Sequence, residues 1–499
     1  MSARRRWGLL VTVGIGLLLV ALDNSVLYTA LPTLTEQLGA STTQGLWIIN
    51  AYPLVVAGLL LGSGTLGDRV GHRRMFVWGL VIFGSASLAA AFAPTAEALI
   101  AGRAVLGIGA AAMMPATLAL IRITFEDPRE RNIAIAVWGS LAVVGAALGP
   151  ILGGGLLEYF WWGSIFLINV PVVIGALIAV SIIAPPNVRN PDKSWDAVSS
   201  AQIMVGLVGT VLTIKELAHS PQNWPMIGGA VLAAVLGFTL FARRQRRLPE
   251  PLLDFGLFRN PAFTAGVIAA AGAMFAIAGV ELLTTQRFQL VDGMTPLHAG
   301  VLVALVAVGS LPTSLIGGAV VHRTGMFPLI AGGLGFAALG VVAVIGAVHT
   351  DSVAAVVGGL LMTGAGLGAT MSVASIAIVG NAPAPRAGMA SSMEEVSYEF
   401  GSLTAVALLG SLLTVVYSAT LRVPAGSPLG VEGQSLTTIL AEGGQSPIVV
   451  AAREAFDNGY SLAMAVAAAV LVAASVATGV LLRRRPATSE VTREYASVH

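Results

Sequence analysis

The chain has 499 residues, of which 56% are hydrophobic and only 10% are charged, and its mean hydropathy is +0.84. This composition predicts a polytopic membrane protein and leaves no room for a soluble domain of ordinary size. The absence of cysteine excludes disulfides, thiolate metal sites and cysteine nucleophiles, and the net charge of +2 gives no indication of a nucleic-acid partner.

Apolar segments long enough to cross a membrane recur along nearly the whole chain. A span needs about 20 apolar residues to cross a hydrocarbon core of about 30 Å. The first segment follows Arg4, Arg5 and Arg6 and is too long for a signal-peptide core, so we expect it to be retained. We predict 14 spans, at residues 8–31, 46–67, 75–93, 97–122, 131–157, 164–184, 199–216, 225–242, 262–286, 297–320, 326–347, 352–381, 390–417 and 460–482.

The basic residues test this number of spans, because positively charged loops stay in the cytoplasm. Alternating sides from a cytoplasmic N-terminus puts most of the 27 Lys and Arg residues inside and only Arg287, Arg422 and Arg453 outside. A wrong number would have scrambled the bias. We therefore expect a multi-pass protein of the bacterial cytoplasmic membrane with both termini in the cytoplasm.

A weak internal repeat divides the chain. Residues 64–71 align with 318–325, each in a turn after a span, and Gly107 and Gly109 have counterparts in Gly364 and Gly366. Repeated helical halves flanking a central site are the usual architecture of secondary transporters. We predict a six-helix half at 1–184, an inserted helix pair with its flanking loops at 185–261, and a second half at 262–499 with an external loop at 418–459 and a cytoplasmic tail.

The fifth predicted span is unusually rich in helix-weakening residues. Glycine lets a neighbouring helix approach the backbone, and proline removes one backbone hydrogen bond and bends the axis. We predict a close-packed pivot formed by Gly145, Gly149, Pro150, Gly153 and Gly154.

Together these motifs resemble the major facilitator superfamily, and within it the 14-helix drug/proton antiporters. Residues 64–74 resemble the family's loop signature, 102–109 its helix 4 signature and 145–154 its helix 5 antiporter signature. Residues 22–32, 46–48, 166–171, 251–254 and 393–401 are similar to motifs of the 14-helix branch. The resemblance implies an all-α major facilitator fold, two pseudo-symmetric six-helix halves plus two inserted helices.

The loop signature implies a conformational latch. A simpler role, in which the positive charges anchor the membrane topology, also explains these residues. Both roles can hold together. In the family such a loop locks the cytoplasmic ends of the halves when the cavity faces outward, with the aspartate bound to a helix N-terminus or an arginine. The latch residues are Gly64, Asp68, Arg69, Gly71, Arg73 and Arg74.

Asp23 and Arg103 are charged residues inside predicted spans, where charge is costly and marks function by default. We predict that Asp23 couples transport to protons, because a proton and a cationic substrate would compete for its carboxylate. The alternative is an acid satisfied by a neighbouring amide or hydroxyl. The resemblance implies that Arg103 tunes a nearby acid, plausibly Asp23, and the alternative is a static clamp on helix carbonyls.

Glu395 and Glu399 are spaced i, i+4 at the start of the predicted thirteenth span and share one helix face. Such a pair would titrate as a unit, which suits proton release or capture of a cationic drug. Glu394 points about 100° away and is expected to be merely interfacial. If the span starts later, all three acids are solvated instead.

Two departures from the branch concern substrate charge. Some relatives that export dications carry an acid where this chain has Asn50, and another near Ser310. Glu281, in the ninth predicted span, is an unexpected acid that is a candidate to substitute for them in proton coupling. The substrate cavity is predicted to involve Asn50, Tyr52, Trp138, Phe275, Ser310 and Tyr398, although most aromatic residues simply pack.

Three functions compete at this stage. The first is a proton-coupled antiporter that exports lipophilic, cationic drugs, dyes or antibiotics by alternating access, as a monomer and without a cofactor beyond the proton gradient. The second is the same fold used to export one endogenous product or lipid, or to import a nutrient with protons. The third is a membrane enzyme, which the scattered six histidines disfavour. The sequence contains no GxxxxGK[ST] loop, so ATP is not the direct energy source.

Overall fold

The computed structural model describes residues 1–190, 195–218, 222–249, 251–350, 352–382, 386–423, 436, 439–440 and 446–483. Fourteen helices in these ranges are long and apolar enough to cross a membrane, which confirms the predicted number and the all-α class. The elements are α1 (Ala3–Gln37), α2 (Thr42–Val70), α3 (His72–Ala91), α4 (Ala96–Thr124), α5 (Pro128–Tyr159), α6 (Ser164–Leu167), α7 (Asn169–Ile183), α8 (Ala197–Ala218), α9 (Trp224–Gln245), η1 (Phe255–Arg259), α10 (Pro261–Leu290), α11 (Pro296–Thr324), η2 (Pro328–Gly332), α12 (Gly333–His349), α13 (Val353–Val379), α14 (Ala387–Thr420) and α16 (Pro447–Arg483).

The last helix begins well before the predicted residue 460, so the predicted external loop at 418–459 is too long at its C-terminal end. Pro447 starts α16, as proline commonly does at a first helical position. The prediction took the whole stretch 418–459 as a loop because it is rich in glycine, proline and serine. In the fold Asp457 accepts a hydrogen bond from Arg287 of α10 at 3.0 Å, so its charge is satisfied.

The predicted span at 164–184 is interrupted at Ile168, between α6 and α7. Pro171 explains the interruption, because it lacks an amide hydrogen and its ring clashes with the carbonyl four residues earlier. The predicted repeat has a structural counterpart at the ends of α2 and α11. Each helix is followed by a glycine with positive φ, Gly71 at 97° and Gly325 at 78°, a conformation that glycine adopts without steric cost.

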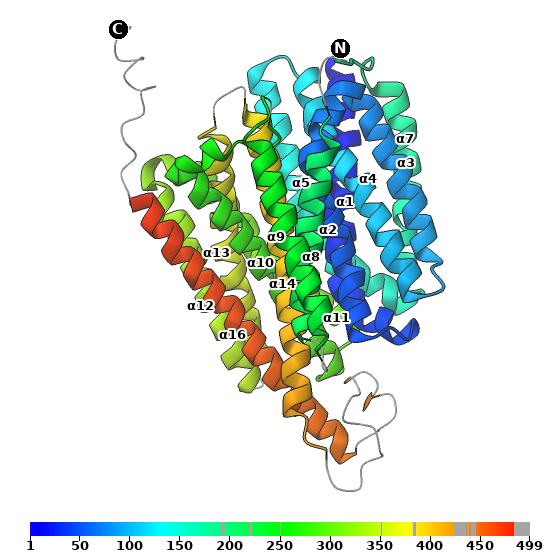
Figure 1. The fold of residues 1–499 in the computed structure, drawn as a ribbon, viewed down its shortest axis with the longest axis vertical. Helices are drawn as coiled ribbons and strands as arrows, with labels where there is room; N and C mark the ends of the chain where they lie inside the picture. The colour runs from blue at the N-terminus through cyan, green and yellow to red at the C-terminus, as the bar shows by residue number, and fades with distance from the viewer. Residues whose placement is uncertain are drawn as a thin grey trace.

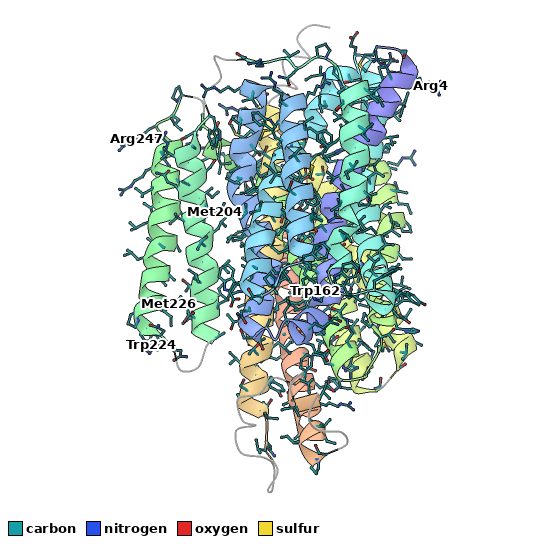
Figure 2. All side chains as sticks on the ribbon, turned by 90° about the vertical axis from the view of Figure 1, so that its right-hand side faces the viewer. Arg4, Trp162, Met204, Trp224, Met226 and Arg247 are labelled. Atoms are coloured by element: carbon teal, nitrogen blue, oxygen red, sulfur yellow. The ribbon has the colours of Figure 1, made fainter. Side chains whose placement is uncertain are left out.

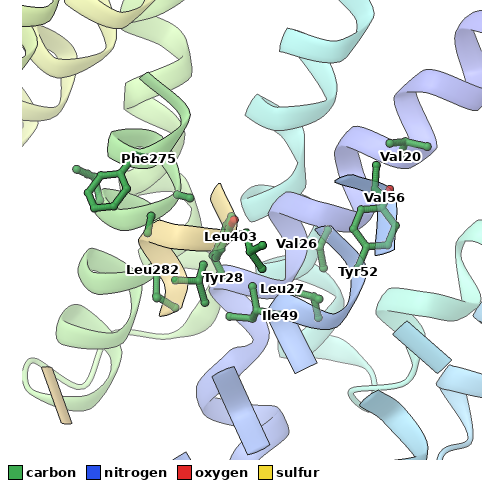
Figure 3. Packing of buried hydrophobic residues seen from close by; sticks show 14 of the residues in the cluster. Val20, Val26, Leu27, Tyr28, Ile49, Tyr52, Val56, Phe275, Leu282 and Leu403 are labelled. Atoms are coloured by element: carbon green, nitrogen blue, oxygen red, sulfur yellow. The ribbon is translucent and has the colours of Figure 1, made fainter. Parts of the chain in front are cut away.

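The helices form two bundles that lie side by side (Figure 1). Helices α1 to α7 make one half and α10 to α16 the other, and they meet where α1 packs on α10, α2 on α14 and α5 on α11. Figure 3 shows this junction, with Leu27 and Tyr28 of α1 beside Leu282 of α10 and Leu403 of α14. All four side chains are buried, so apolar packing extends from one half into the other.

Hydrogen bonds between the described residues of the two halves lie from the middle of the bundle to the end away from the N-terminus. Thr285 donates to the Tyr28 carbonyl and Gln289 to the Thr29 carbonyl, both at 2.9 Å. Close to the far ends of α5 and α11, Glu158 accepts a hydrogen bond from Thr295 at 3.5 Å. These contacts hold the halves together at the end opposite the N-terminus.

The inserted helices α8 and α9 stand as a pair beside the bundle (Figure 2). Helix α8 packs on both α2 and α14, so it covers the seam between the halves. Met204 of α8 fits against Gly58 of α2, where a β-carbon would collide with its side chain. The pair is therefore packed against both halves.

An ion pair joins the inserted helices at the end of the bundle that contains the N-terminus. Asp196 accepts hydrogen bonds from Arg244 at 2.9 and 3.0 Å. Burial alone would raise the pKa of Asp196, but the hydrogen bonds from Arg244 and Ser199 outweigh it and hold the pKa below its usual value. Asp196 consequently stays ionised at neutral pH, and the ion pair persists.

Candidate functional site

A buried ion pair lies inside the first half. The guanidinium of Arg103, from α4, donates through Nη1 to Asp23 of α1, and both side chains are at most 1% exposed. Asn169, at the start of α7, donates to the other Asp23 oxygen at 3.1 Å and contacts the Ser87 hydroxyl at 3.3 Å. Arg103 and Asp23 thus lie together as expected, and an amide binds the same acid, as in the alternative; a role of the pair in proton coupling stays a prediction.

Arg103 has a second contact and one free nitrogen. Its Nε donates to the Ile48 carbonyl at 3.2 Å, and the guanidinium lies 4.5 Å from the centre of the Tyr52 ring. Its Nη2 has no hydrogen-bond partner among the described residues, and the same holds for the Tyr52 hydroxyl and the Asn50 amide. A desolvated cation with an unused donor thus lies against the ring of a tyrosine whose hydroxyl also has no partner among the described residues.

The second half contributes three carboxyl groups to this region. Glu399 of α14 and Glu281 of α10 are 7% and 4% exposed, and both lie within electrostatic range of Tyr28 of α1. The hydroxyl of Tyr28 is 2.9 Å from that of Ser402, one turn beyond Glu399. Glu399 is also within electrostatic range of Arg103, and its Oε2 has no hydrogen-bond partner among the described residues.

Tyr52 connects the two groups of acids. It lies within electrostatic range of Asp23 and Arg103 in its own half and of Glu395 and Glu399 in the other. Tyr52 thereby relates the Asp23 and Arg103 pair, inside the first half, to Glu395 and Glu399 across the junction, and Glu281 lies within electrostatic range of Tyr28. The alternative in which the α14 acids are all solvated is wrong, because α14 already begins at Ala387 and Glu399 is buried.

Glu394 was expected to be merely interfacial, and the structure corrects this. It accepts hydrogen bonds from Tyr398 at 2.8 Å and from Ser375 of α13 at 3.2 Å. The helical angle correctly put Glu394 on a different face from Glu395, but that face packs against α13. Tyr398, a predicted cavity residue, is engaged in this bond.

The remaining predicted cavity residues are dispersed. Trp138 of α5 donates to Thr117 of α4 at 3.1 Å, inside the first half. Phe275 is buried in α10 where it packs on α14, and Ser310 donates to the Ala307 carbonyl of its own helix at 2.9 Å. Of the predicted cavity residues, Tyr52 lies against the guanidinium of Arg103, and Asn50 is buried in α2.

The predicted glycine run on α5 packs as closely as expected. A β-carbon would come within 2.7 Å of Ala21 at Gly145 and within 3.0 Å of Val26 at Gly153, and at Gly149 it would collide with Ser25. Gly154 instead faces Leu297 and Pro296 of α11 in the other half. On α11, Gly300 faces the carbonyl of Pro150, so the same run holds α5 against α1 and across the junction.

The loop at 64–74 is bonded to its own half in this conformation. Asp68 pairs with His72 at 3.0 Å, and Arg73 donates to the Ser181 carbonyl at 3.1 Å. The Arg74 amide donates to Asn187 at 3.1 Å, and Asn187 covers Gly71 so closely that a β-carbon there would collide with it. The described partner of the Asp68 side chain is thus a histidine, rather than the expected helix N-terminus or arginine, and the role as a latch between the halves stays a prediction.

Two buried polar residues were missed by the sequence analysis. Asn169 lies within the motif at 166–171. The signal available in the sequence was a polar side chain inside an apolar span. Lys215 of α8 is 5% exposed, and its ammonium lies 4.2 Å from the centre of the Trp47 ring of α2. No sequence pattern linked Lys215 to Trp47, because their contact depends on where α8 packs.

Comparison with known proteins identifies the chain. The family model described as Major Facilitator Superfamily matches residues 13–406. The chain belongs to the major facilitator superfamily. This major facilitator protein is 36% identical, over 96% of its length and 97% of the other protein, to the multidrug efflux pump LfrA of Mycolicibacterium smegmatis. It is also 36% identical to the methyl viologen resistance protein SmvA of Salmonella typhimurium, over 95% of this chain and 97% of the other.

The fold comparison agrees with this assignment. A bacterial homologue of the human lysosomal transporter Spinster, in an inward-facing and unoccupied conformation, superimposes with a TM-score of 0.68 over 97% of this chain and 98% of the other, at 16% identity. The superfamily member described here is therefore a multi-pass membrane transporter and not an enzyme.

Proposed function

We propose that this transporter exports lipophilic cations, including drugs and dyes, across the bacterial cytoplasmic membrane in exchange for protons. The observation that carries the proposal is a set of acids on either side of the junction between the halves. Asp23 pairs with Arg103 in the first half, and Glu399, which lies within electrostatic range of Arg103, stands with Glu281 and Glu395 in the second. Carboxylates buried next to lipid are costly unless they are protonated or bind a cation. Relatives named for multidrug efflux and methyl viologen resistance support the export of such compounds.

The proposed coupling uses the free groups on either side of the junction. In this conformation Arg103 holds Asp23, whereas its Nη2 and the Glu399 Oε2 are both unused. A proton on Asp23 would cancel its negative charge and weaken its hold on Arg103, leaving the guanidinium free to turn toward Glu399. The Arg103 guanidinium would then compete with a cationic drug for the carboxylates of Glu395 and Glu399. The transporter cannot hold the drug and the guanidinium there at once.

The direction of transport follows from the proposed orientation. The proposal puts the end of the bundle that contains the N-terminus in the cytoplasm, and the basic residues in the loops at that end support it. The halves are joined at the opposite end, so the conformation described here corresponds to the state that admits substrate from the cytoplasm. Export then requires the contacts between α5 and α11 to open and the ends at the loop 64–74 to close.

Efflux of ethidium from preloaded vesicles under an imposed pH gradient tests the proposal. We expect efflux to follow the gradient. Asp23→Asn should reduce the initial rate at least about tenfold, equivalent to an increase of roughly 1.4 kcal/mol in the activation free energy. Glu395→Gln should also slow it. The matched control is Glu36→Gln, which neutralises an exposed acid near the end of the same helix and should leave efflux unchanged.

The other outcomes decide between the alternatives. Efflux that ignores the pH gradient, or that is intact in Asp23→Asn, contradicts proton coupling through this site. If no lipophilic cation moves, the export of drugs is contradicted and one endogenous product becomes the substrate to test. Uptake with protons, rather than efflux, would indicate a nutrient symporter.

A further inference from the structure

A groove opens on the outer side of the second half, where α16 packs on α12 and η2. It has a volume of about 430 Å³ and is lined by the C-terminal part of α16. That end of α16 points to the same side of the bundle as the N-terminus (Figure 1, red, upper left). Its lining residues are Phe327, Ala331, Gly332, Gly335, Ser475, Val476, Gly479, Val480 and Arg483. Val476 and Val480 are 61% and 51% exposed, so in a membrane this groove faces lipid rather than the transport site.

The chemistry of the groove defines its occupant. Among the described lining residues, the polar side chains are Ser475 and Arg483, and the Ser475 hydroxyl already donates to the Ala331 carbonyl at 2.7 Å. The groove therefore offers an apolar channel with a cation at one end. Arg483 is held over that end by Phe327, whose ring centre lies 4.6 Å from the guanidinium.

Charge at this level of the membrane is concentrated. Arg483 is followed in the sequence by Arg484 and Arg485, and the exposed Arg323 precedes Phe327 by four residues. Under the proposed orientation Arg483 and Arg323 lie at the cytoplasmic leaflet, where basic groups between membrane helices attract anionic lipid headgroups. A guanidinium also matches the geometry of a phosphate.

We propose that the groove binds an anionic phospholipid of the cytoplasmic leaflet, with an acyl chain along the glycine-lined floor and the phosphate on Arg483. The small residues Gly332, Gly335 and Gly479 create the depth for the chain. The site is separate from the junction between the halves, so this inference rests on the proposed orientation and on no property of the transport site.

The test uses the full chain, purified in detergent and washed free of lipid. Dioleoyl phosphatidylglycerol is compared with dioleoyl phosphatidylcholine, with native mass spectrometry to count bound lipids and tryptophan fluorescence to follow thermal unfolding. We expect phosphatidylglycerol to remain bound and to raise the Tm by several degrees more than phosphatidylcholine. In Arg483→Ala this difference should be lost, together with at least one bound lipid.

A second variant tests the groove without changing charge. A β-carbon at Gly332 meets nothing within 4 Å and its φ is −65°, so Gly332→Leu fits the backbone and fills the groove. It should also lose the bound phosphatidylglycerol. Gly346→Leu, an exposed and equally open position on α12, is the matched control and should keep it.

Arg243→Ala controls for unspecific electrostatic attraction of lipid. It removes an exposed arginine in the last turn of α9, at the same end of the bundle as Arg483. If Arg243→Ala weakens phosphatidylglycerol binding as much as Arg483→Ala does, the attraction is diffuse and the proposed site is wrong. Equal binding of phosphatidylcholine, or unchanged binding in Gly332→Leu, would also overturn the proposal. None of these measurements depends on transport, so failure of the efflux assay would not imitate them.

Discussion

At the scale of single residues, the site depends on a guanidinium that makes contacts in two directions. Arg103 bonds Asp23 through Nη1 and the Ile48 carbonyl through Nε, which joins α4 to α1 and to α2. Only a planar fork of donors can do both while its face lies against Tyr52. A lysine would keep the charge but could not reproduce this arrangement.

We therefore predict that Arg103→Lys is not a conservative change. The initial rate of ethidium efflux should fall at least about tenfold, corresponding to roughly 1.4 kcal/mol, although the charge is retained. Arg122→Lys, at the exposed end of the same helix, should transport normally. Wild-type efflux by Arg103→Lys would show that the positive charge alone is sufficient.

Much of this residue-level site could be predicted from the sequence, since a charge inside an apolar span must find a partner. The sequence analysis named both members of the Asp23 and Arg103 pair and the acids of α14. It misplaced Glu394, because the angle around a helix says which face a residue occupies but not what packs there. It missed Asn169 for the same reason.

At the scale of elements, helix α5 shows how backbone contact replaces side-chain packing. Gly145, Gly149 and Gly153 recur every four residues and so lie on one face, which is pressed against α1. Gly154 lies on the adjacent face and touches α11. One helix thereby contacts a neighbour in its own half and a neighbour in the other half.

This packing predicts different effects for two alanine substitutions on α5. Gly149→Ala places a β-carbon against Ser25 and should cost about 1–3 kcal/mol of overpacking, with a lower Tm and slower efflux. Gly139→Ala adds the same methyl group where nothing lies within 4 Å, and should behave like the wild type. Equal Tm values and rates for the two variants would show that α1 and α5 need not approach so closely. The measurements are thermal unfolding in detergent and vesicle efflux.

The bounds of the helices could be predicted from the sequence wherever the thickness of the bilayer alone sets the length of the apolar segment. They were wrong at the start of α16, because a stretch rich in glycine, proline and serine was read as a loop to its end, whereas the helix begins at Pro447 and its Asp457 is paired with Arg287. The interruption at Ile168 could have been predicted from Pro171, because a proline disturbs the turn that precedes it.

At the scale of the whole molecule, alternating access requires the contact between the far ends of α5 and α11 to break in each cycle. Glu158 and Thr295 lie across that contact, with 3.5 Å between their side-chain oxygens. The chain contains no cysteine, so an introduced pair would provide the only two thiols. A covalent link at this position would hold the halves in the conformation described here.

We predict that Glu158→Cys combined with Thr295→Cys is active until a short bifunctional thiol reagent is added, and then loses efflux. A reducible reagent should allow recovery on reduction. Gln44→Cys with Glu97→Cys is the matched control, because these positions are hydrogen-bonded within one half and move together. Full efflux by the cross-linked Glu158 and Thr295 pair would show that this end need not open.

The sequence by itself determined the class, the number of spans and the repeated plan of this superfamily member, because the bilayer imposes length, apolarity and charge asymmetry on each segment separately. It also identified most of the acids near the junction between the halves, since each is costly where it stands. Only the tertiary structure decided that the halves are joined away from the N-terminus, that α8 covers their seam, and that Arg483 lies over an apolar groove. Those features depend on which helix faces pack together, and the spacing of residues along one helix carries no information about its neighbour.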